Sequence, residues 1–437
     1  MGKKRACYHC GLENHRAKDC PQAICRLCGE TGHDVGSCPQ KPLPPVDLGS
    51  FHHDVAASNP NGKSFTYIEL FAGIGGFRIA LDRLGGRCVF SSEIDRFARA
   101  SYETNYGDRP AGDITRISEE DIPPHDMLVG GFPCQSFSFS GERKGFDDHR
   151  GVLFLEIVRI LKKHQPKVIL LENVRGLLTH EDGRTLQVII SHLDQVGYDI
   201  KYQILDAVHL VPQERKRVYI VGIRKDLLIV GASSSDYFEF PNIPNLERGF
   251  QDVVEKDHSM EPSMLEKLRL SDHQLTKVRN QTYTQQFPEA RFLSDFGLPT
   301  KTLQSSYASY MVGSQFVKEE EESPDELDSD YWRKLSPREA ARLQGFPESF
   351  ELCSSRPYHL FGNAVVPSMI SLIAAGLLRF LYDDDDNDDS TTIDDDAKES
   401  PTSIGWRIAS ELLLEACPED RKDALRLLLD EKLVHDT

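Results

Sequence analysis

Residues 126–136 read Asp-Met-Leu-Val-Gly-Gly-Phe-Pro-Cys-Gln-Ser, in which the cysteine is Cys134. The apolar run 127–129 predicts a buried strand, and the two glycines followed by Pro133 predict that this strand ends in a tight turn. A loop of small, polar and charged residues, 138–151, comes next. A parallel α/β sheet presents a nucleophile at its carboxyl edge in this way. The alternative is that Cys134 is a small buried core residue, as many lone cysteines are.

The composition is that of an ordinary water-soluble chain. With 437 residues, 39% of them hydrophobic and 27% charged, the chain is expected to form two or three domains. Its longest apolar run, 369–378, is too short to span a bilayer, so we expect no membrane partner. The N-terminal residues lack the apolar segment of a secretory signal. We therefore expect a protein that is not secreted, located in the nucleus of a eukaryote or otherwise in the cytoplasm, with reduced cysteines.

The net charge of −18 is concentrated in two tracts. Residues 318–330 contain eight acids and one lysine, and residues 383–399 contain ten acids and one lysine, which leaves only −2 for the rest of the chain. Residues 1–41 are basic, with seven Lys or Arg against four acids. Such acidic tracts are typically solvated, and a mimic of a phosphate backbone is the alternative. The overall acidity therefore does not exclude a nucleic-acid partner.

Two copies of a Cys-x2-Cys-x4-His-x4-Cys spacing lie within residues 1–41. Three thiolates and one imidazole complete the tetrahedral shell that structural zinc prefers, and segments this short have no core of their own. The pattern resembles the retroviral-type zinc knuckle, which implies binding of single-stranded nucleic acid or RNA; knuckles that bind protein are the alternative. The predicted ligands of two Zn2+ ions are Cys7, Cys10, His15, Cys20, Cys25, Cys28, His33 and Cys38.

A glycine-rich turn and two acids predict a nucleoside pocket. The run 64–70 predicts a first strand, and the residues behind it predict a turn into a helix: Phe71, Ala72, Gly73, Ile74, Gly75 and Gly76. A second strand, 88–92, ends before Glu93 and Ile94, where a Rossmann-like sheet binds ribose hydroxyls. Asp113, followed by Ile114, could accept from an adenine amino group. A glycine-rich turn alone would be as consistent with packing as with binding.

Several segments, in this order, resemble the motifs of the cytosine-5 DNA methyltransferases, and most closely the compact bacterial enzymes: residues 71–76, Glu93, 112–114, 131–136, 172–174, 213–217, 338–347 and 362–367. The resemblance covers about residues 64–381. It implies an α/β fold, with a Rossmann-like methyltransferase sheet and a smaller target-recognition domain, to which this chain adds small zinc knuckles. It also implies S-adenosyl-L-methionine as cofactor and DNA as partner.

The resemblance assigns catalytic roles to four residues. Carbon 5 of cytosine is a poor nucleophile, so the family adds a thiolate to carbon 6, and Cys134 matches that residue. Glu172, directly after the predicted strand 167–171, matches the acid at ring nitrogen 3; a structural carboxylate paired with an arginine is the alternative. Arg215 and Arg217 alternate along an extended segment, so both should point to one face. One of them, preferably Arg217, should hold the carbonyl oxygen of a cytosine flipped out of the duplex.

The later motifs are expected to complete the two pockets. Asn363 and Ala364 match the segment that returns to the methyl-donor pocket, to which Pro133 is also assigned. Residues 302–303 match the Thr-Leu element that touches the extruded nucleotide. The pattern Ser-Tyr-x2-Tyr-x2-Gly at 306–313 also resembles the branch that methylates transfer RNA, although the usual Cys-Phe-Thr of that branch is absent. An RNA cytosine-5 methyltransferase and a catalytically inactive nucleic-acid-binding module therefore remain as alternatives.

We expect a monomer with seven parts. These are the zinc knuckles (1–41), a flexible linker (42–63), the catalytic domain (64–226), a target-recognition region (227–334), a return segment completing the catalytic domain (335–382), an acidic linker (383–402) and a helical tail (403–437), whose leucine spacing suits packing or a partner.

Overall fold

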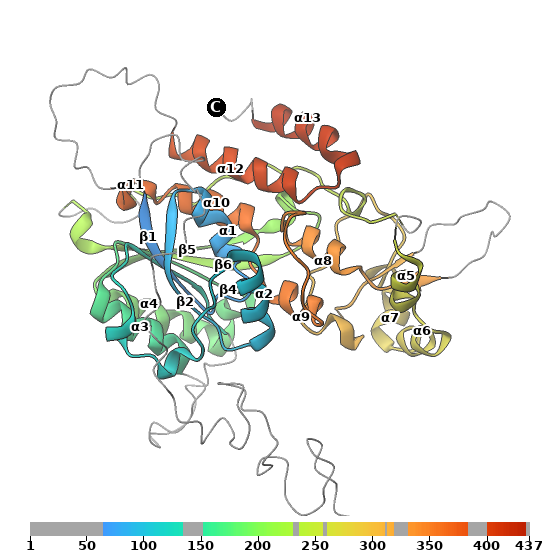
Figure 1. Cartoon of the computed structure of the whole chain (residues 1–437), viewed down its shortest axis with the longest axis horizontal. Coiled ribbons are helices and arrows are strands. Elements are labelled where there is room, and N and C mark those ends of the chain that lie inside the picture. The colour runs from blue at the N-terminus through green and yellow to red at the C-terminus, as the bar shows by residue number, and fades with distance from the viewer. Residues whose placement is uncertain are drawn as a thin grey trace, which may run out of the picture. The chain divides into compact units, whose positions relative to one another are not determined.

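The computed structural model describes residues 64–133, 152–229, 236–256, 260–310, 313–318, 331–382 and 400–433 (Figure 1). The predicted zinc ligands, Cys134 and nearly all of both acidic tracts lie outside the described residues.

Six strands form the central sheet, in the order β2-β1-β3-β4-β6-β5. Their bounds are β1 Phe65–Leu70, β2 Gly86–Ser92, β3 Met127–Gly131, β4 Val168–Val174, β5 Tyr198–Asp206 and β6 Lys216–Arg224. Strands β1 to β4 are parallel, whereas β6 runs antiparallel to both β4 and β5. The predicted α/β fold is confirmed.

Helices cover both faces of this sheet (Figure 1). Tyr67 and Leu170 face the core that contains α1 and α10, whereas Ile68 and Leu171 face the core that contains α3 and α4. Neighbouring strand residues thus point into opposite cores, which explains why the central strands are apolar throughout. The helices are α1 Gly76–Arg83, α2 Arg96–Tyr106, α3 Val152–His164, α4 Arg184–Gln195, α10 Pro367–Ala375 and α11 Leu378–Leu381.

The structure differs from the predicted elements at three places. Strand β5 was not predicted, because it is an edge strand in which polar and apolar residues mix and several side chains are half-buried or exposed. Glu172 lies inside β4, because that strand continues as far as Val174. Residues 369–381, for which the apolar sequence predicts one helix, are divided into α10 and α11 at Gly376, a residue with low helix propensity.

A second, smaller sheet, in the order β7-β8-β9, lies in the recognition part of the chain. Its core is a separate cluster that includes Leu275, Val278 and Phe316. The elements of this part are α5 Pro262–Leu268, α6 Asp272–Arg279, α7 Thr282–Gln286, β7 Phe292–Leu293, β8 Phe316–Lys318 and β9 Trp332–Arg333.

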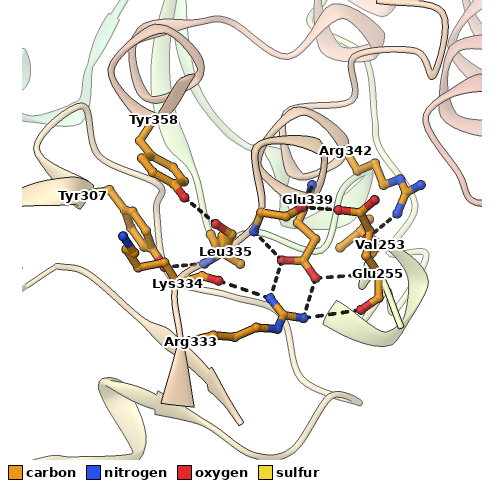
Figure 2. Close-up of polar contacts among 10 residues, drawn as sticks. Val253, Glu255, Tyr307, Arg333, Lys334, Leu335, Glu339, Arg342 and Tyr358 are labelled. Carbon is orange, nitrogen blue, oxygen red and sulfur yellow. Dashed lines mark hydrogen bonds and ion pairs between the residues drawn. The ribbon is translucent and has the colours of Figure 1, made fainter. Parts of the chain in front are cut away.

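A buried polar junction joins the recognition part to helix α8 (Pro337–Leu343), as Figure 2 shows. The Glu339 carboxylate accepts hydrogen bonds from the Arg333 guanidinium at 2.8 and 2.9 Å, from the Ser336 amide at 2.7 Å and from the Glu255 amide at 2.9 Å. The side chains of Arg333 and Glu339 are 1% and 0% exposed. Because both charges are paired inside the protein, they fix β9 against α8.

Two tyrosines extend this junction toward helix α9 (Pro357–Asn363). The hydroxyl of Tyr307 accepts from the Leu335 amide at 2.9 Å, and the hydroxyl of Tyr358, in α9, donates to the Leu335 carbonyl (Figure 2). Helix α9 ends at Asn363, so the junction also positions the segment that was predicted to complete the methyl-donor pocket.

The C-terminal helices α12 (Pro401–Glu415) and α13 (Lys422–Leu433) pack on the same fold. Helix α12 lies against α10, where a Cβ at Gly405 would lie 2.7 Å from the Cβ of Ala375. Arg83 donates two hydrogen bonds to the Glu415 carboxylate, at 3.0 and 2.6 Å. These contacts fix α12 on the core formed by α1 and α10.

Among the described helices, the segment Pro357–Ala375 is long and apolar enough to cross a membrane. It comprises α9 and α10, and 89% of its most apolar window is buried inside the fold. This segment is therefore part of the hydrophobic core of the protein.

Candidate active site

The ends of strands β3 and β4 lie side by side at the carboxyl edge of the sheet. Gly131 pairs with Glu172 in the parallel register, and a Cβ at Gly131 would lie 3.3 Å from Glu172 Oε2. The side chain of Asn173 donates to the Phe132 carbonyl at 2.9 Å and so fixes the turn after β3. Pro133, which is exposed, ends the described segment, and Cys134 lies outside it. The chain that leads into Cys134 thus runs beside Glu172.

Glu172 forms an ion pair with Arg217. The distance from Arg217 Nε to Glu172 Oε1 is 3.0 Å, and the two side chains are 12% and 11% exposed. Burial raises the pKa of the Glu172 carboxyl, while Arg217 and then Arg215 act in the opposite direction. The raised pKa favours the neutral carboxyl, which can donate a hydrogen bond.

Arg215 lies two residues before Arg217 but has different partners. Its guanidinium donates to the carbonyl of Leu303 at 3.4 Å, of Gly362 at 3.1 Å and of Ala364 at 2.6 Å. Burial lowers its pKa, and the nearby Arg217 acts in the same direction. Arg215 therefore connects three segments of backbone, whereas Arg217 directs its Nε to the acid.

The turn after β1 is held in an unusual backbone conformation. Phe71, Gly73 and Gly75 have φ angles of 56°, 56° and 80°, in the left-handed region, which is costly for Phe71. Glu93 accepts from the Gly73 amide at 2.8 Å and from the Asp95 amide at 2.7 Å. Glu93, which is predicted to bind the ribose, therefore also fixes the glycine-rich turn. It can do so because the ends of β1 and β2 lie side by side.

The remaining predicted cofactor residues surround this turn. Ile94 is 69% exposed although it is large and apolar, as expected for a residue that a planar ligand could cover. Asp113 accepts from the amide and hydroxyl of Thr115, at 3.1 and 2.8 Å, and caps a short turn, while Ile114 is buried. A Cβ at Gly76 would lie 2.7 Å from Val365 Cγ2, so the return segment reaches the turn. Asn363 is exposed and Ala364 buried.

The sequence of this chain matches two families of known proteins. Residues 65–379 match the sequence model of the C-5 cytosine-specific DNA methylases. The chain belongs to this family. Residues 5–22 match the zinc-knuckle model. Both predicted resemblances are thereby confirmed, and the expectation of a DNA cytosine-5 methyltransferase is confirmed with them.

Type II methyltransferases of bacteria are similar to this methyltransferase over most of their length. M.DsaV of Dactylococcopsis salina is 39% identical, over 73% of this chain and 87% of that protein. M.HhaI of Haemophilus parahaemolyticus is 36% identical, over 70% of this chain and 92% of that protein. Among solved structures, the Dnmt2 methyltransferase of S. pombe has the same fold, with a TM-score of 0.57, 23% identity and coverage of 72% of this chain and 98% of that one.

Two residues near the glycine-rich turn of the methyltransferase were not predicted from the sequence. The Tyr106 hydroxyl donates to the carbonyls of Ile74 and Gly75, at 3.2 and 2.9 Å. Glu69, fully buried in β1, accepts from the Tyr102 hydroxyl at 3.0 Å, and burial raises its pKa to about 8. A charged residue within an apolar strand was the available signal for Glu69. No comparable signal marked Tyr106, because its contact depends on how α2 packs.

Within the described residues, no group of three or more His, Cys, Asp or Glu side chains is arranged to hold a metal ion. The eight predicted zinc ligands all lie outside those residues. Cys88, Cys353 and Cys417 are free thiols in the described part of the chain.

Proposed function

We propose that this protein transfers a methyl group from S-adenosylmethionine to carbon 5 of a flipped-out cytosine in DNA, through a covalent adduct with Cys134. The observation that carries the proposal is the buried Glu172–Arg217 pair, 3.0 Å apart, at the strand end that adjoins the chain leading to Cys134. Membership of the C-5 cytosine-specific DNA methylase family supports the same reaction.

The proposed chemistry begins at Cys134. Its thiolate forms a bond to carbon 6. The electrons of the carbon 5–carbon 6 double bond then shift through the ring toward nitrogen 3. The neutral carboxyl of Glu172 donates a hydrogen bond or a proton at nitrogen 3, which neutralises the developing charge and leaves carbon 5 nucleophilic. Carbon 5 then takes the methyl group, whose bond to the donor sulfur breaks. A base removes the proton from carbon 5, nitrogen 3 returns its proton to Glu172, the thiolate leaves carbon 6 and the aromatic ring is restored.

Arg217 has two tasks in this proposal. Its Nε orients the Glu172 carboxyl, and its remaining N–H groups can donate to the carbonyl oxygen of the base. Arg215 is a positioning residue, because it is bonded to backbone carbonyls of Leu303, Gly362 and Ala364.

The residues around the glycine-rich turn fit S-adenosylmethionine. The left-handed backbone at Phe71 and Gly73 opens the turn, and the exposed Ile94 offers an apolar face to a purine. The Glu93 carboxylate suits ribose hydroxyls, and Asp113 suits an amino group of adenine. The cofactor, when bound, supplies the methyl group as a sulfonium.

The zinc knuckles are proposed to deliver the enzyme to nucleic acid, with one structural zinc ion in each. Their basic composition and the match of residues 5–22 to the zinc-knuckle model support this role. Deletion of residues 1–41 should weaken DNA binding more than it lowers turnover at saturating DNA, and the lost affinity should depend on salt. Equal affinity of truncated and full-length protein at low and high salt would point to a protein partner instead.

A covalent trap tests the proposed reaction. Cytosine with fluorine at carbon 5 can accept the thiolate and the methyl group but has no proton to lose, so the adduct should persist. Duplex DNA that contains 5-fluorocytosine should give an adduct that survives denaturation and requires both S-adenosylmethionine and Cys134. The Cys134→Ser variant should give none while it still binds the cofactor in calorimetry. An adduct with fluorinated transfer RNA and not with DNA of varied sequence would establish the RNA alternative.

A further inference from the structure

A cavity of about 420 Å³ opens in the recognition part of the molecule. It is bounded by chain segments that are distant in sequence, and its lining residues include Glu214, Tyr283, Lys301, Thr302, Gln304 and Gly313. Its walls carry a carboxylate, an ammonium group, a phenol, a hydroxyl and a carboxamide, so it is suited to a polar planar ligand.

The cavity is fixed relative to the candidate active site. Thr302 Oγ1 donates to the carbonyl of Glu214 at 2.5 Å, and the Glu214 amide donates to the Thr300 carbonyl at 2.8 Å. The next residue, Arg215, donates to the Leu303 carbonyl. Because this segment continues into Arg217, a molecule in the cavity would lie at a set position relative to the base held there.

Gln304 presents its carboxamide to this cavity. The residue is exposed, and within the described part of the chain its side chain has one hydrogen bond, at 3.5 Å from the Ser306 hydroxyl. The adjacent donor and acceptor of a carboxamide match the N6 donor and N7 acceptor of adenine, so one side chain can read one base.

Gly313 leaves the space that this carboxamide occupies. A Cβ at Gly313 would lie 2.6 Å from the side-chain amide carbon of Gln304, so an alanine there would displace the end of this flexible side chain. The φ angle of Gly313 is not in the left-handed region, so an alanine would disturb the contact and not the local backbone.

The rim of the cavity suits nucleic acid. Lys301 pairs with Glu214 at 2.6 Å, and both side chains are about half exposed, at 49% and 45%. Tyr283 and Phe287, in and after α7, have ring centroids 5.3 Å apart and are 36% and 48% exposed. Exposed aromatic rings beside a cation and a free carboxamide are typical of a surface that contacts bases.

We infer that Gln304 determines sequence specificity: from the space left by Gly313, it reads a base-pair edge beside the target cytosine, for which adenine is the best match. This inference rests on the proposed DNA methyltransferase function. It assigns Gln304 as the reader, Gly313 as the residue that leaves room for its carboxamide, and the cavity as the space into which the base edge enters.

Methylation of a random-sequence duplex library, read base by base, tests the inference. The full-length protein should show a base preference at one position near the methylated cytosine. Gln304→Ala should reduce the preference at that position by about 5- to 150-fold and leave the other positions unchanged. Gln286→Ala, on an exposed residue of α7 that does not line the cavity, is the matched control and should leave the whole pattern intact.

The Gly313→Ala variant tests whether the observed position of the carboxamide is needed for reading the base. It should relax the same position as Gln304→Ala, but it should have no further effect in a Gln304→Ala background, because its clash is with the Gln304 side chain. Equal thermal melting of the variants would show that all are folded. An unchanged sequence pattern in Gln304→Ala would overturn the inference while the proposed function stands. Absence of DNA methylation by the unsubstituted protein would overturn the proposed function and this inference together.

Discussion

Two glutamate–arginine pairs in the described part of the molecule are buried, and they are built differently. At the junction, the Glu339 carboxylate accepts four hydrogen bonds, two of them from Arg333, and is 0% exposed. In β4, near the carboxyl ends of the parallel strands, Glu172 forms an ion pair through Oε1 with Arg217, its one partner among the described residues. The Glu172 side chain is 11% exposed.

The number of donors around each carboxylate explains this difference. A carboxylate that is saturated by fixed donors has no oxygen free for another molecule and serves to join elements. A buried carboxylate with one fixed partner has a raised pKa and retains an oxygen for another molecule. The first arrangement stabilises the fold, and the second can do chemistry.

The largest expected effect is on catalysis at Glu172. Glu172→Gln should lower the single-turnover rate of methyl transfer by roughly 10²–10⁴-fold, because the acid at nitrogen 3 is lost. In the proposed mechanism the protonated form of Glu172 is the donor, so the rate of methyl transfer should fall as pH rises through its raised pKa, and this decline should be absent in the variant. Glu239→Gln, at an exposed position, is the control. Turnover like that of the unsubstituted enzyme would remove Glu172 from its role.

The next effect is on stability at the junction. Arg333→Ala leaves the Glu339 carboxylate buried without its cation, which should cost about 3–5 kcal/mol. Urea unfolding should report the loss, with Arg87→Ala on the exposed side of β2 as control. A loss of unfolding free energy below about 1 kcal/mol would mean that the junction relaxes around the missing side chain. The number of hydrogen bonds at each carboxylate would then not distinguish the two pairs.

Two neighbouring arginines sharpen the same comparison. Arg215→Met should lower the free energy of unfolding by about 1–3 kcal/mol, because buried carbonyls lose their donor. Arg217→Met should reduce methyl transfer with a smaller loss of stability, because Glu172 can take up a proton when its cation is removed. Chemical denaturation and single-turnover rates should be measured on both variants. Equal losses of stability and equal losses of rate in Arg215→Met and Arg217→Met would contradict this division of roles.

The smallest effect concerns Glu69, beneath the glycine-rich turn. Its pKa is about 8 in the folded protein, against an ordinary value of 4.5, so the folded state binds more protons between these values. The unfolding free energy should therefore fall as pH rises through this range, by about 1 kcal/mol between pH 6.5 and 7.5. Glu69→Gln imitates the neutral acid and should flatten this slope.

His125 gives a contribution of the opposite sign and serves as an internal check. Burial lowers its pKa to about 4, so the folded state binds fewer protons than the unfolded state, and stability falls as pH decreases from 6.5 to 4. This acid-side loss should persist in Glu69→Gln. If the unfolding free energy changes with pH above 6 in the same way in the unsubstituted protein and in Glu69→Gln, Glu69 is ionised in the folded state.

The sequence by itself determined the family and the parallel part of the sheet, and it predicted where the chemistry lies. Apolar runs that end in glycines or acids are local patterns, so the strand before Gly131 and the acid Glu172 could be read without a structure. The turn from Phe71 to Gly76 and its partner Glu93 were predicted in the same way. These features depend on residues that are close in sequence.

Only the tertiary structure decided which residues act together. Arg215 and Arg217 are equivalent in an alternating pattern, and their separate roles depend on carbonyls at Gly362 and Ala364, nearly 150 residues away. The contact of Gln304 with Gly313 and the packing of α12 on α10 are likewise invisible to periodicity. Long-range contacts are set by how elements pack, because packing selects one partner for each side chain among many that its chemistry would allow.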